Sequence, residues 1–173
     1  TEEVLRILST LRPVDGRMEV IRSADGITGI VDYAHTPDAV ENVIEAINRL
    51  RQGAGRLIVI VGAGGDRDRT KRPVMARIAA AGADRLILTS DNPRSEDPET
   101  IIDDMLAGLS PDAVPKMIRI TGRADAIRAA VMLATPGDII LVAGKGHETY
   151  QEVKGVRHHF DDREELRKAF KMS

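Results

Sequence analysis

The sequence predicts an α/β protein in which a doubly wound, mostly parallel sheet of about six strands is covered by helices on both faces. Three observations predict this class. Short, continuous apolar runs such as 57–61 alternate along the chain with longer segments whose apolar residues recur at helical spacing. Polar and glycine-rich residues follow most of the apolar runs. After residue 148 the period changes, and Lys154-Gly155 separates two short segments that we expect to pair as a C-terminal antiparallel hairpin.

The expected elements follow one another in a regular order. The strands of the sheet are expected at 27–32, 57–61, 85–89, 117–121 and 138–143. Helices are expected at about 2–9, 37–50, 73–81, 98–109, 123–134 and 161–170, and the hairpin strands at 149–153 and 156–160. Thr36-Pro37-Asp38 and Asp97-Pro98 carry N-terminal helix signals, and Asp161 with Glu164 resembles a capping box. Right-handed crossovers between parallel strands then give a Rossmann-like arrangement.

Length and composition narrow the possible classes of protein. A chain of 173 residues without a visible linker or repeat is expected to form a single domain over 1–173. It has no cysteine, which excludes disulfides and thiolate sites and fits a reducing cytoplasm. The net charge is −2 and no block of Lys or Arg stands out, so neither a nucleic-acid partner nor a membrane partner is expected.

Polar clusters follow four of the expected strands, and the carboxyl ends of parallel strands share one edge of the sheet. The clusters are Asp32–His35, Gly65–Asp68, Asp91–Arg94 and Gly144–Glu148. Doubly wound sheets bind ligands at this edge, so the convergence predicts a binding site. Taken singly, each signal is weaker. Asp32 could bind a metal or a ribose, or only cap its turn, and His35 could reach a phosphate or remain solvated.

Two glycine-containing loops resemble phosphate-binding loops only in part. Gly62–Gly65 lacks the required spacing, and the acids that follow it would repel phosphate, so a flexible loop is the default interpretation. Gly144–Gly146 is followed by a hairpin, whereas a phosphate-binding loop opens a helix. His158 and His159 are adjacent on a strand and would point to opposite faces, which argues against a shared metal. We expect no metal site and no catalytic residue on this chain.

The segment Asp91–Arg94 is the most informative part of the sequence. Asp91 can bind an ammonium group, and the guanidinium of Arg94 can bind a carboxylate through two parallel hydrogen bonds. Pro93 makes the turn between them rigid. The expected ligand is therefore a small zwitterionic or phosphorylated molecule, such as an amino acid.

Four motifs, taken in order, resemble one protein family. They are Val31–Pro37, Gly64–Asp68 with Lys71–Pro73, Asp91–Arg94, and Gly144–Glu148. Together with Gly16–Glu19 and Phe160–Glu164, they are similar to the C-terminal domain of the Mur ligases, and within this family to the members that add the third residue of the peptidoglycan stem peptide. The resemblance covers essentially the whole chain, and the ordered set is far more specific than any single motif.

The resemblance implies ATP-dependent amide-bond formation. In this family ATP phosphorylates the D-glutamate carboxylate of UDP-MurNAc-L-Ala-D-Glu, and the amine of a diamino acid attacks the acyl phosphate. The C-terminal domain holds the incoming amino acid and closes over ATP and Mg²⁺, which the central domain mainly binds. We expect the central ATP-binding domain and the N-terminal UDP-binding domain to lie outside this chain, which begins at Thr1 like a trimmed ligase. The chain alone is then expected to turn nothing over.

The same resemblance assigns residues. The amino-acid pocket would be formed by Arg67, Asp91, Asn92, Pro93, Arg94, Gly144 and Glu148. The nucleotide would face Arg17, Asp32 and His35. Arg94 favours meso-diaminopimelate over L-lysine, because diaminopimelate carries one further, distal carboxylate that a guanidinium can bind, and lysine-type family members lack arginine at the matching place.

Two alternatives remain open at this point. One keeps the reaction and makes L-lysine the substrate. The other is a non-catalytic module that binds a small molecule, which the lack of a visible base, nucleophile or complete ATP site favours. A dinucleotide-binding oxidoreductase is excluded because no G-x-G-x-x-G follows the first strand.

Overall fold

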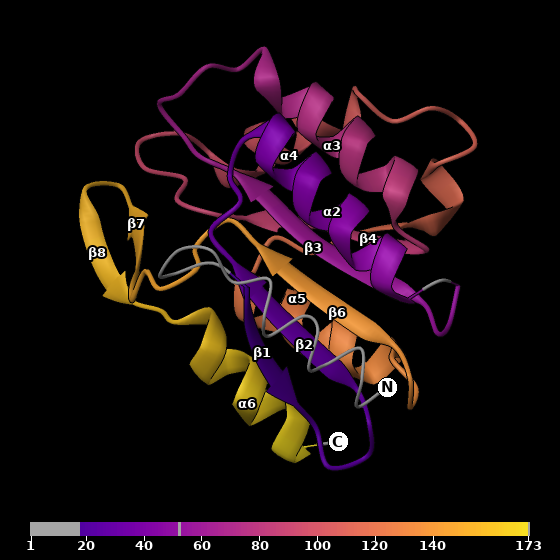
Figure 1. The fold of residues 1–173 in the computed structure, drawn as a ribbon. Helices are drawn as coiled ribbons and strands as arrows, with labels where there is room; N and C mark the ends of the chain where they lie inside the picture. The colour runs from indigo at the N-terminus through magenta and orange to yellow at the C-terminus, as the bar shows by residue number, and fades with distance from the viewer. Residues whose placement is uncertain (1–17, 52, 173) are drawn as a thin grey trace.

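The computed structural model of the protein describes residues 18–51 and 53–172. Six strands form one sheet in the order β1-β2-β6-β3-β4-β5 (Figure 1). The strands are β1 (Glu19–Arg22), β2 (Thr28–Asp32), β3 (Leu57–Ala63), β4 (Arg85–Ser90), β5 (Met117–Arg119) and β6 (Ile139–Ala143). All neighbours are parallel except β1 and β2, which are antiparallel. The expected doubly wound, mostly parallel sheet is confirmed.

Helices cover the two faces of the sheet and divide the core into two clusters (Figure 1). On one face lie α2 (Pro37–Arg51), α3 (Lys71–Gly82) and α4 (Pro98–Leu106), and on the other lie α5 (Arg123–Leu133) and α6 (Asp162–Met172). Every residue of β3 and β6 is buried, as expected for central strands that are covered on both sides. A short 3₁₀ helix, η1 (Val114–Lys116), precedes β5.

The local signals in the sequence explain where several elements begin. The Thr36 hydroxyl accepts the Ala39 N–H at 3.2 Å before α2, and the Asp97 carboxylate accepts the Glu99 N–H at 2.9 Å before α4. The hairpin strands β7 (Tyr150–Val153) and β8 (Val156–His159) pair antiparallel outside the main sheet. Their turn residues, Lys154 and Gly155, have φ angles of 50° and 77°, as a two-residue hairpin loop requires.

Several local expectations differ from the structure. The helix expected at 98–109 ends at Leu106, and the strand expected at 117–121 ends at Arg119. The helix expected at 73–81 begins two residues earlier, at Lys71. Asp161 caps α6 by accepting the Arg163 N–H at 2.9 Å, but the Glu164 carboxylate lies 2.8 Å from the His159 ring, so the capping box is not reciprocal. The edge strand β1 is additional, since its four residues are too few to show a pattern. The helix expected at 2–9 lies outside the described residues.

The sheet places the four polar clusters at one edge. Asp32 at the end of β2 is in register with Ala143 at the end of β6, and Ala63 at the end of β3 with Ser90 at the end of β4. The loops that follow these strands therefore start side by side. The hairpin joins them, because Arg94 bridges to Val153 of β7.

Candidate functional site

A pocket of about 400 Å³ lies at this edge of the sheet, a size that suits a small molecule. Among the residues that line it are six of the seven expected to bind the amino acid, and one of the three expected to face the nucleotide. These are Arg67, Asp91, Asn92, Arg94, Gly144 and Glu148, with His35. The convergence of the four loops is thus observed. Pro93 is not a lining residue, and its carbonyl accepts the Glu96 N–H at 3.0 Å.

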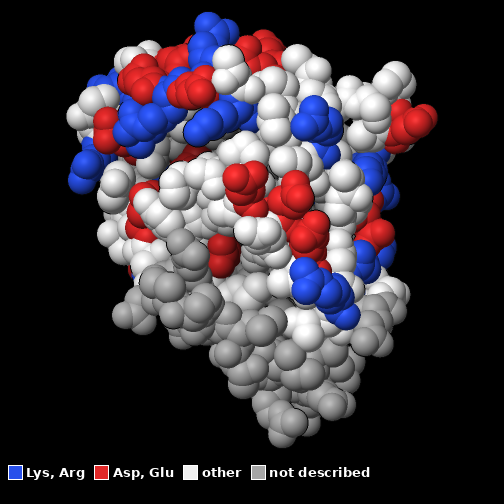
Figure 2. Space-filling view, turned by 45° about the horizontal axis from the view of Figure 1, so that its top comes forward, with Lys and Arg blue, Asp and Glu red and all other residues white. Residues whose placement is uncertain are grey.

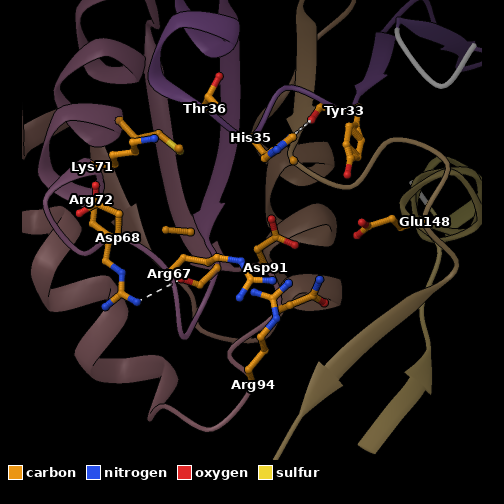
Figure 3. A pocket seen from close by; sticks show the side chains of 15 residues that line it. Tyr33, His35, Thr36, Arg67, Asp68, Lys71, Arg72, Asp91, Arg94 and Glu148 are labelled. Atoms are coloured by element: carbon orange, nitrogen blue, oxygen red, sulfur yellow. Dashed lines mark hydrogen bonds between the residues drawn. The ribbon is translucent and has the colours of Figure 1, made fainter. Parts of the chain in front are cut away.

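Opposite charges lie in different parts of the pocket (Figure 3). The guanidinium groups of Arg67 and Arg94 lie near Asp91, and Glu148 lies on the other side of Asp91, towards the hairpin. Lys71 lies on the far side from Glu148, on the first turn of α3. A molecule that carries both ammonium and carboxylate groups can therefore find a partner for each of them.

The backbone of the Asp91–Arg94 loop is fixed on both sides. The Asn92 carbonyl accepts the Gly65 N–H at 2.8 Å, and the Asn92 amide oxygen accepts the Glu152 N–H at 3.0 Å. The Asp91 carbonyl accepts a hydrogen bond of 2.8 Å from the Gln151 side chain. A Cβ on Gly65 would lie 1.8 Å from the Pro93 carbonyl, so only glycine permits this close approach. The loop is therefore preorganised.

Arg94 has an unusual conformation for a non-glycine residue, with φ at 52°. Two hairpin hydrogen bonds hold it there: its N–H donates to the Glu152 carbonyl at 3.0 Å, and its carbonyl accepts the Lys154 N–H at 2.7 Å. Its guanidinium donates to the Gly65 carbonyl at 2.9 Å. Backbone strain of this kind persists where the surroundings impose it, and it is common at ligand-binding sites.

Glu148 and Tyr33 in the pocket have pKa values raised by burial together with nearby charges, a combination that is common at functional sites. Burial raises the pKa of Glu148, and the nearby Asp91 carboxylate raises it further, against the opposing effects of Lys145, Asn92 and His35. Burial also raises the pKa of Tyr33, followed by the charges of Glu148 and Asp91. The pocket thus holds two carboxylates that a cationic ligand group would stabilise in their ionised form.

A buried ion pair lies directly beneath the pocket, and the sequence did not reveal it. Arg123 and Asp162 are joined by two hydrogen bonds of 2.7 Å, and neither side chain is exposed. Arg123 also donates to the carbonyls of Ser90 and Ala143, each at 3.0 Å. Ser90 and Ala143 immediately precede Asp91 and Gly144, so Arg123 joins the ends of β4 and β6 from which the pocket loops start.

Arg72 was part of a motif but had no expected role. It is 1% exposed, and its guanidinium donates to the Glu96 carboxylate at 2.5 Å and to the Gly64 carbonyl at 3.1 Å. Glu96 in turn accepts the Asp66 N–H at 2.6 Å. Arg72 therefore fixes the glycine-rich loop, which contradicts the expectation that this loop is simply flexible.

The three residues expected to face the nucleotide have different surroundings. Asp32 is 6% exposed, and its two carboxylate oxygens accept the N–H groups of Met18 and Ala34, each at 2.8 Å. This arrangement agrees with the interpretation of Asp32 as a turn cap. The His35 ring lines the pocket, with Nδ1 2.9 Å from the Tyr33 carbonyl and its ring edge-on to that of Tyr33. Arg17 lies outside the described residues.

No group of three or more His, Cys, Asp or Glu side chains among residues 18–51 and 53–172 is arranged to hold a metal ion. None of the helices in these ranges has the length and apolarity needed to cross a membrane. On the face shown in Figure 2, basic and acidic side chains are interspersed over the surface that is not drawn in grey.

Comparison with known proteins places these features in a family. The family described as "Mur ligase, glutamate ligase domain" matches residues 16–146. A UDP-N-acetylmuramoyl-L-alanyl-D-glutamate–2,6-diaminopimelate ligase from Bacteroides thetaiotaomicron is 60% identical over 169 residues, which cover 98% of this chain and 35% of that protein. The chain spans about a third of the length of the curated relatives it matches.

Solved structures agree with this match. A structure of a UDP-N-acetylmuramoyl-L-alanyl-D-glutamate–2,6-diaminopimelate ligase is 48% identical, with a TM-score of 0.83 over 92% of this chain and 32% of that chain. A bifunctional folylpolyglutamate synthase/dihydrofolate synthase from Yersinia pestis, complexed with AMPPNP and a Mn ion, is 20% identical, with a TM-score of 0.56 over 76% of this chain and 28% of that chain. This second likeness shows the fold alone. With four motif loops around one pocket and a match over most of its length, the chain belongs to the Mur ligase family and corresponds to its C-terminal domain.

Proposed function

We propose that this chain is the amino-acid-binding part of an ATP-dependent ligase that adds meso-diaminopimelate to UDP-MurNAc-L-Ala-D-Glu in peptidoglycan synthesis. The observation that carries the proposal is a pocket of opposed charges in a chain about 60% identical to diaminopimelate ligases. The N-terminal UDP-binding part and the central ATP-binding part then lie outside this chain.

The charges of the pocket suggest how the amino acid is held. Asp91 and Glu148 take an ammonium group, and Arg94 and Arg67 take a carboxylate. Diaminopimelate has two groups of each kind, whereas L-lysine lacks the distal carboxylate. With lysine bound, a guanidinium that the pocket has preorganised would lack its anionic partner. Such an unpaired group strongly lowers kcat/KM for the substrate that lacks the partner. Gly144 and Asn92 complete the wall beside Asp91.

A nucleotide would lie towards His35 and Lys71, whose side chains line the same pocket and can donate to phosphate oxygens. ATP supplies the phosphoryl group that activates the D-glutamate carboxylate, and Mg²⁺ would be held mainly by the part of the parent outside this chain. Arg17 and Asp32 belong to this nucleotide-facing set by resemblance. A reaction that consumes ATP and a UDP-linked precursor suits the cytoplasm.

The 173-residue chain alone is proposed to be inactive. No catalytic residue is assigned to it, and its described residues hold no metal-ligating cluster. The test uses ATP, UDP-MurNAc-dipeptide and meso-diaminopimelate, with chromatography to follow the tripeptide product. Detectable product from this chain would contradict the proposal.

The substrate is tested with the full-length parent. We expect product with meso-diaminopimelate and at least about 100-fold lower kcat/KM with L-lysine, as for other sites built around a buried polar partner. Preference for L-lysine would overturn the assignment of the amino acid but leave the ligase reaction standing. Binding of either amino acid without ATP-dependent product would instead favour a non-catalytic module.

A further inference from the structure

Lys145 is the one member of the Gly144–Glu148 motif whose side chain is fully buried: it is 0% exposed. Its ammonium group donates to the Asn92 amide oxygen at 2.7 Å and to the Tyr150 carbonyl at 3.1 Å. Asp91 Oδ1 lies 3.0 Å away as an ion-pair partner. An ammonium has three N–H donors, and two of those of Lys145 are used in hydrogen bonds, while Asp91 is a partner by charge only. Because its side chain is fully buried and does not line the pocket, Lys145 acts on a ligand through its neighbours.

These contacts join three parts of the site. Lys145 lies in the loop after β6, Asn92 in the loop after β4, and Tyr150 at the start of β7. Asn92 also accepts the Glu152 N–H, so the lysine and the hairpin share one acceptor. Loss of the ammonium group would leave the Asn92 and Tyr150 oxygens short of a donor at the point where these segments meet.

The charge of Lys145 acts on the two carboxylates of the pocket. Its Nζ lies 3.8 Å from the Glu148 carboxylate and 3.0 Å from that of Asp91. The other buried cations nearby are engaged elsewhere, since Arg123 makes two hydrogen bonds with Asp162 and Arg72 pairs with Glu96 and Asp104. Two carboxylates in a partly buried pocket disfavour each other's ionisation, and a fixed cation beside them offsets this effect.

Several other charged or titratable groups face Glu148. Burial and the Asp91 carboxylate raise the pKa of Glu148, whereas Lys145 lowers it, followed by the Asn92 side chain and His35. Arg123, on α5, and Tyr33, in the loop after β2, also interact electrostatically with Glu148. Of the charges that lower this pKa, Lys145 has the largest effect, so the pH dependence of ligand binding should report its removal.

We propose that Lys145 is a positioning residue that keeps Glu148 ionised beside Asp91 and holds the Asn92 loop against β7, so that an incoming ammonium group meets two carboxylates. This inference rests on the proposed function, because it concerns the same amino-acid pocket. It assigns the lysine a role through its neighbours and no contact with substrate, ATP or phosphate.

The test compares Lys145→Met with Lys116→Met in the full-length parent. Lys116 is a matched control, since its ammonium also donates to a backbone carbonyl, that of Ala83 at 2.8 Å, but it lies far along the chain from the pocket loops and does not line the pocket. Initial rates with meso-diaminopimelate and with ATP are measured from pH 6 to pH 9 to follow KM and kcat, and circular dichroism checks folding. Lys145→Arg, which keeps the charge, is measured in parallel.

We expect Lys145→Met to raise the KM for diaminopimelate roughly ten-fold or more at pH 7, with a much smaller change in the KM for ATP. The acidic limb of kcat/KM for diaminopimelate should move to higher pH, because the pKa of Glu148 rises when its cationic neighbour is lost. Lys145→Arg should keep the limb near its wild-type position. A folded Lys145→Met variant with an unchanged limb, or an equal shift in Lys116→Met, would overturn the proposal.

Should Lys145→Met fail to fold, Glu148→Gln tests whether the ionisation of Glu148 sets the acidic limb of kcat/KM. It removes the carboxylate whose charge Lys145 maintains, so the part of the acidic limb that Glu148 sets must be lost, and a limb identical to that of the wild type would overturn the proposal. The wild-type measurement separates this outcome from failure of the proposed function. A parent that uses L-lysine disproves the diaminopimelate assignment, and the same variants are then compared with lysine, whose ammonium group poses the same requirement.

Discussion

The two ends of strand β6 hold carboxylates in opposite conditions. Just before the strand, Asp138 is 3% exposed and accepts hydrogen bonds from the N–H groups of Thr135 and Arg56 and from the Arg56 guanidinium. Beyond its other end, Glu148 shares the pocket with Asp91 from the loop after β4, and Asp91 Oδ1 is buried without a hydrogen bond among the described residues. Burial alone would raise the pKa of Asp138, but these donors lower it, whereas the pKa of Glu148 is raised.

The difference separates charges that serve the fold from charges that await a ligand. A carboxylate whose oxygens are fully satisfied stabilises the native state when it is ionised. A partly buried carboxylate that lies beside a second carboxylate does not stabilise the native state when it is ionised. The rest of the structure holds it in place. If this division holds, substitutions of the two kinds of charge should affect stability and ligand use differently.

The largest expected effect on stability concerns Arg123. This residue lies at the pocket end, but among the described residues all its hydrogen bonds are to other parts of the fold. Arg123→Met leaves Asp162 buried without its cation and the Ser90 and Ala143 carbonyls without a donor. We expect unfolding to be easier by about 3–5 kcal/mol, measured by chemical denaturation of the chain. Arg128→Met on the same helix is the control, since its exposed pair with Asp125 should be worth at most about 1 kcal/mol. Equal losses in both variants would contradict the division.

Arg94 should show the reverse pattern, because its guanidinium is proposed to await a ligand. In the full-length parent, Arg94→Ala should lower kcat/KM for meso-diaminopimelate by about 100-fold or more. The stability of the chain should change by no more than about 1 kcal/mol, since the side chain loses one hydrogen bond, to the Gly65 carbonyl. Arg157→Ala on β8, where the guanidinium stacks on Tyr150, is the control for loss of a hairpin arginine. Unchanged kcat/KM would show that Arg94 does not select the substrate.

Asp138 gives an intermediate effect with a defined pH dependence. Its folded-state pKa is lowered, so its contribution is present above the unfolded-state pKa and is lost as the pH falls through the folded-state value. Asp138→Asn should therefore destabilise the chain by about 1–3 kcal/mol at pH 7. The gap between the two proteins should narrow in strong acid. A gap that is constant with pH, in denaturation curves recorded at each pH, would mean that ionisation of Asp138 is not its source.

The sequence predicted the parallel strands because both faces of such strands are buried. Their sequences are therefore continuous apolar runs, such as 57–61. It also predicted the site edge, since the carboxyl ends of parallel strands meet there, and the resemblance to a family gave the residues that line it. The edge strand β1 escaped prediction because four residues at a sheet edge carry little periodicity. A local sequence pattern therefore suffices to predict an element whose buried residues recur regularly along several residues.

The supporting charges could not be predicted in the same way. Arg123 begins a helix and Lys145 lies in a loop, both places where charged side chains are usually exposed. Their burial depends on partners 39 residues away for Arg123 and 53 residues away for Lys145. Only the assembled fold brings these partners together. Pro93 illustrates the converse, because its place in a motif suggested ligand contact, whereas its carbonyl approaches the backbone of Gly65.

The smallest expected effect on stability is also the sharpest test of the comparison. The raised pKa of Glu148 means that its stability contribution is present below the unfolded-state pKa and is lost as the pH rises through the folded-state value. At pH 7 the ionised carboxylate therefore opposes folding, and Glu148→Gln should leave the chain as stable as the wild type or more stable, by no more than about 1 kcal/mol. Asp138→Asn makes the same chemical change, a carboxylate to an amide, at the other end of β6 and should have the opposite sign. Destabilisation by Glu148→Gln at pH 7 would mean that its charge serves the fold, and the distinction between the two ends would fail.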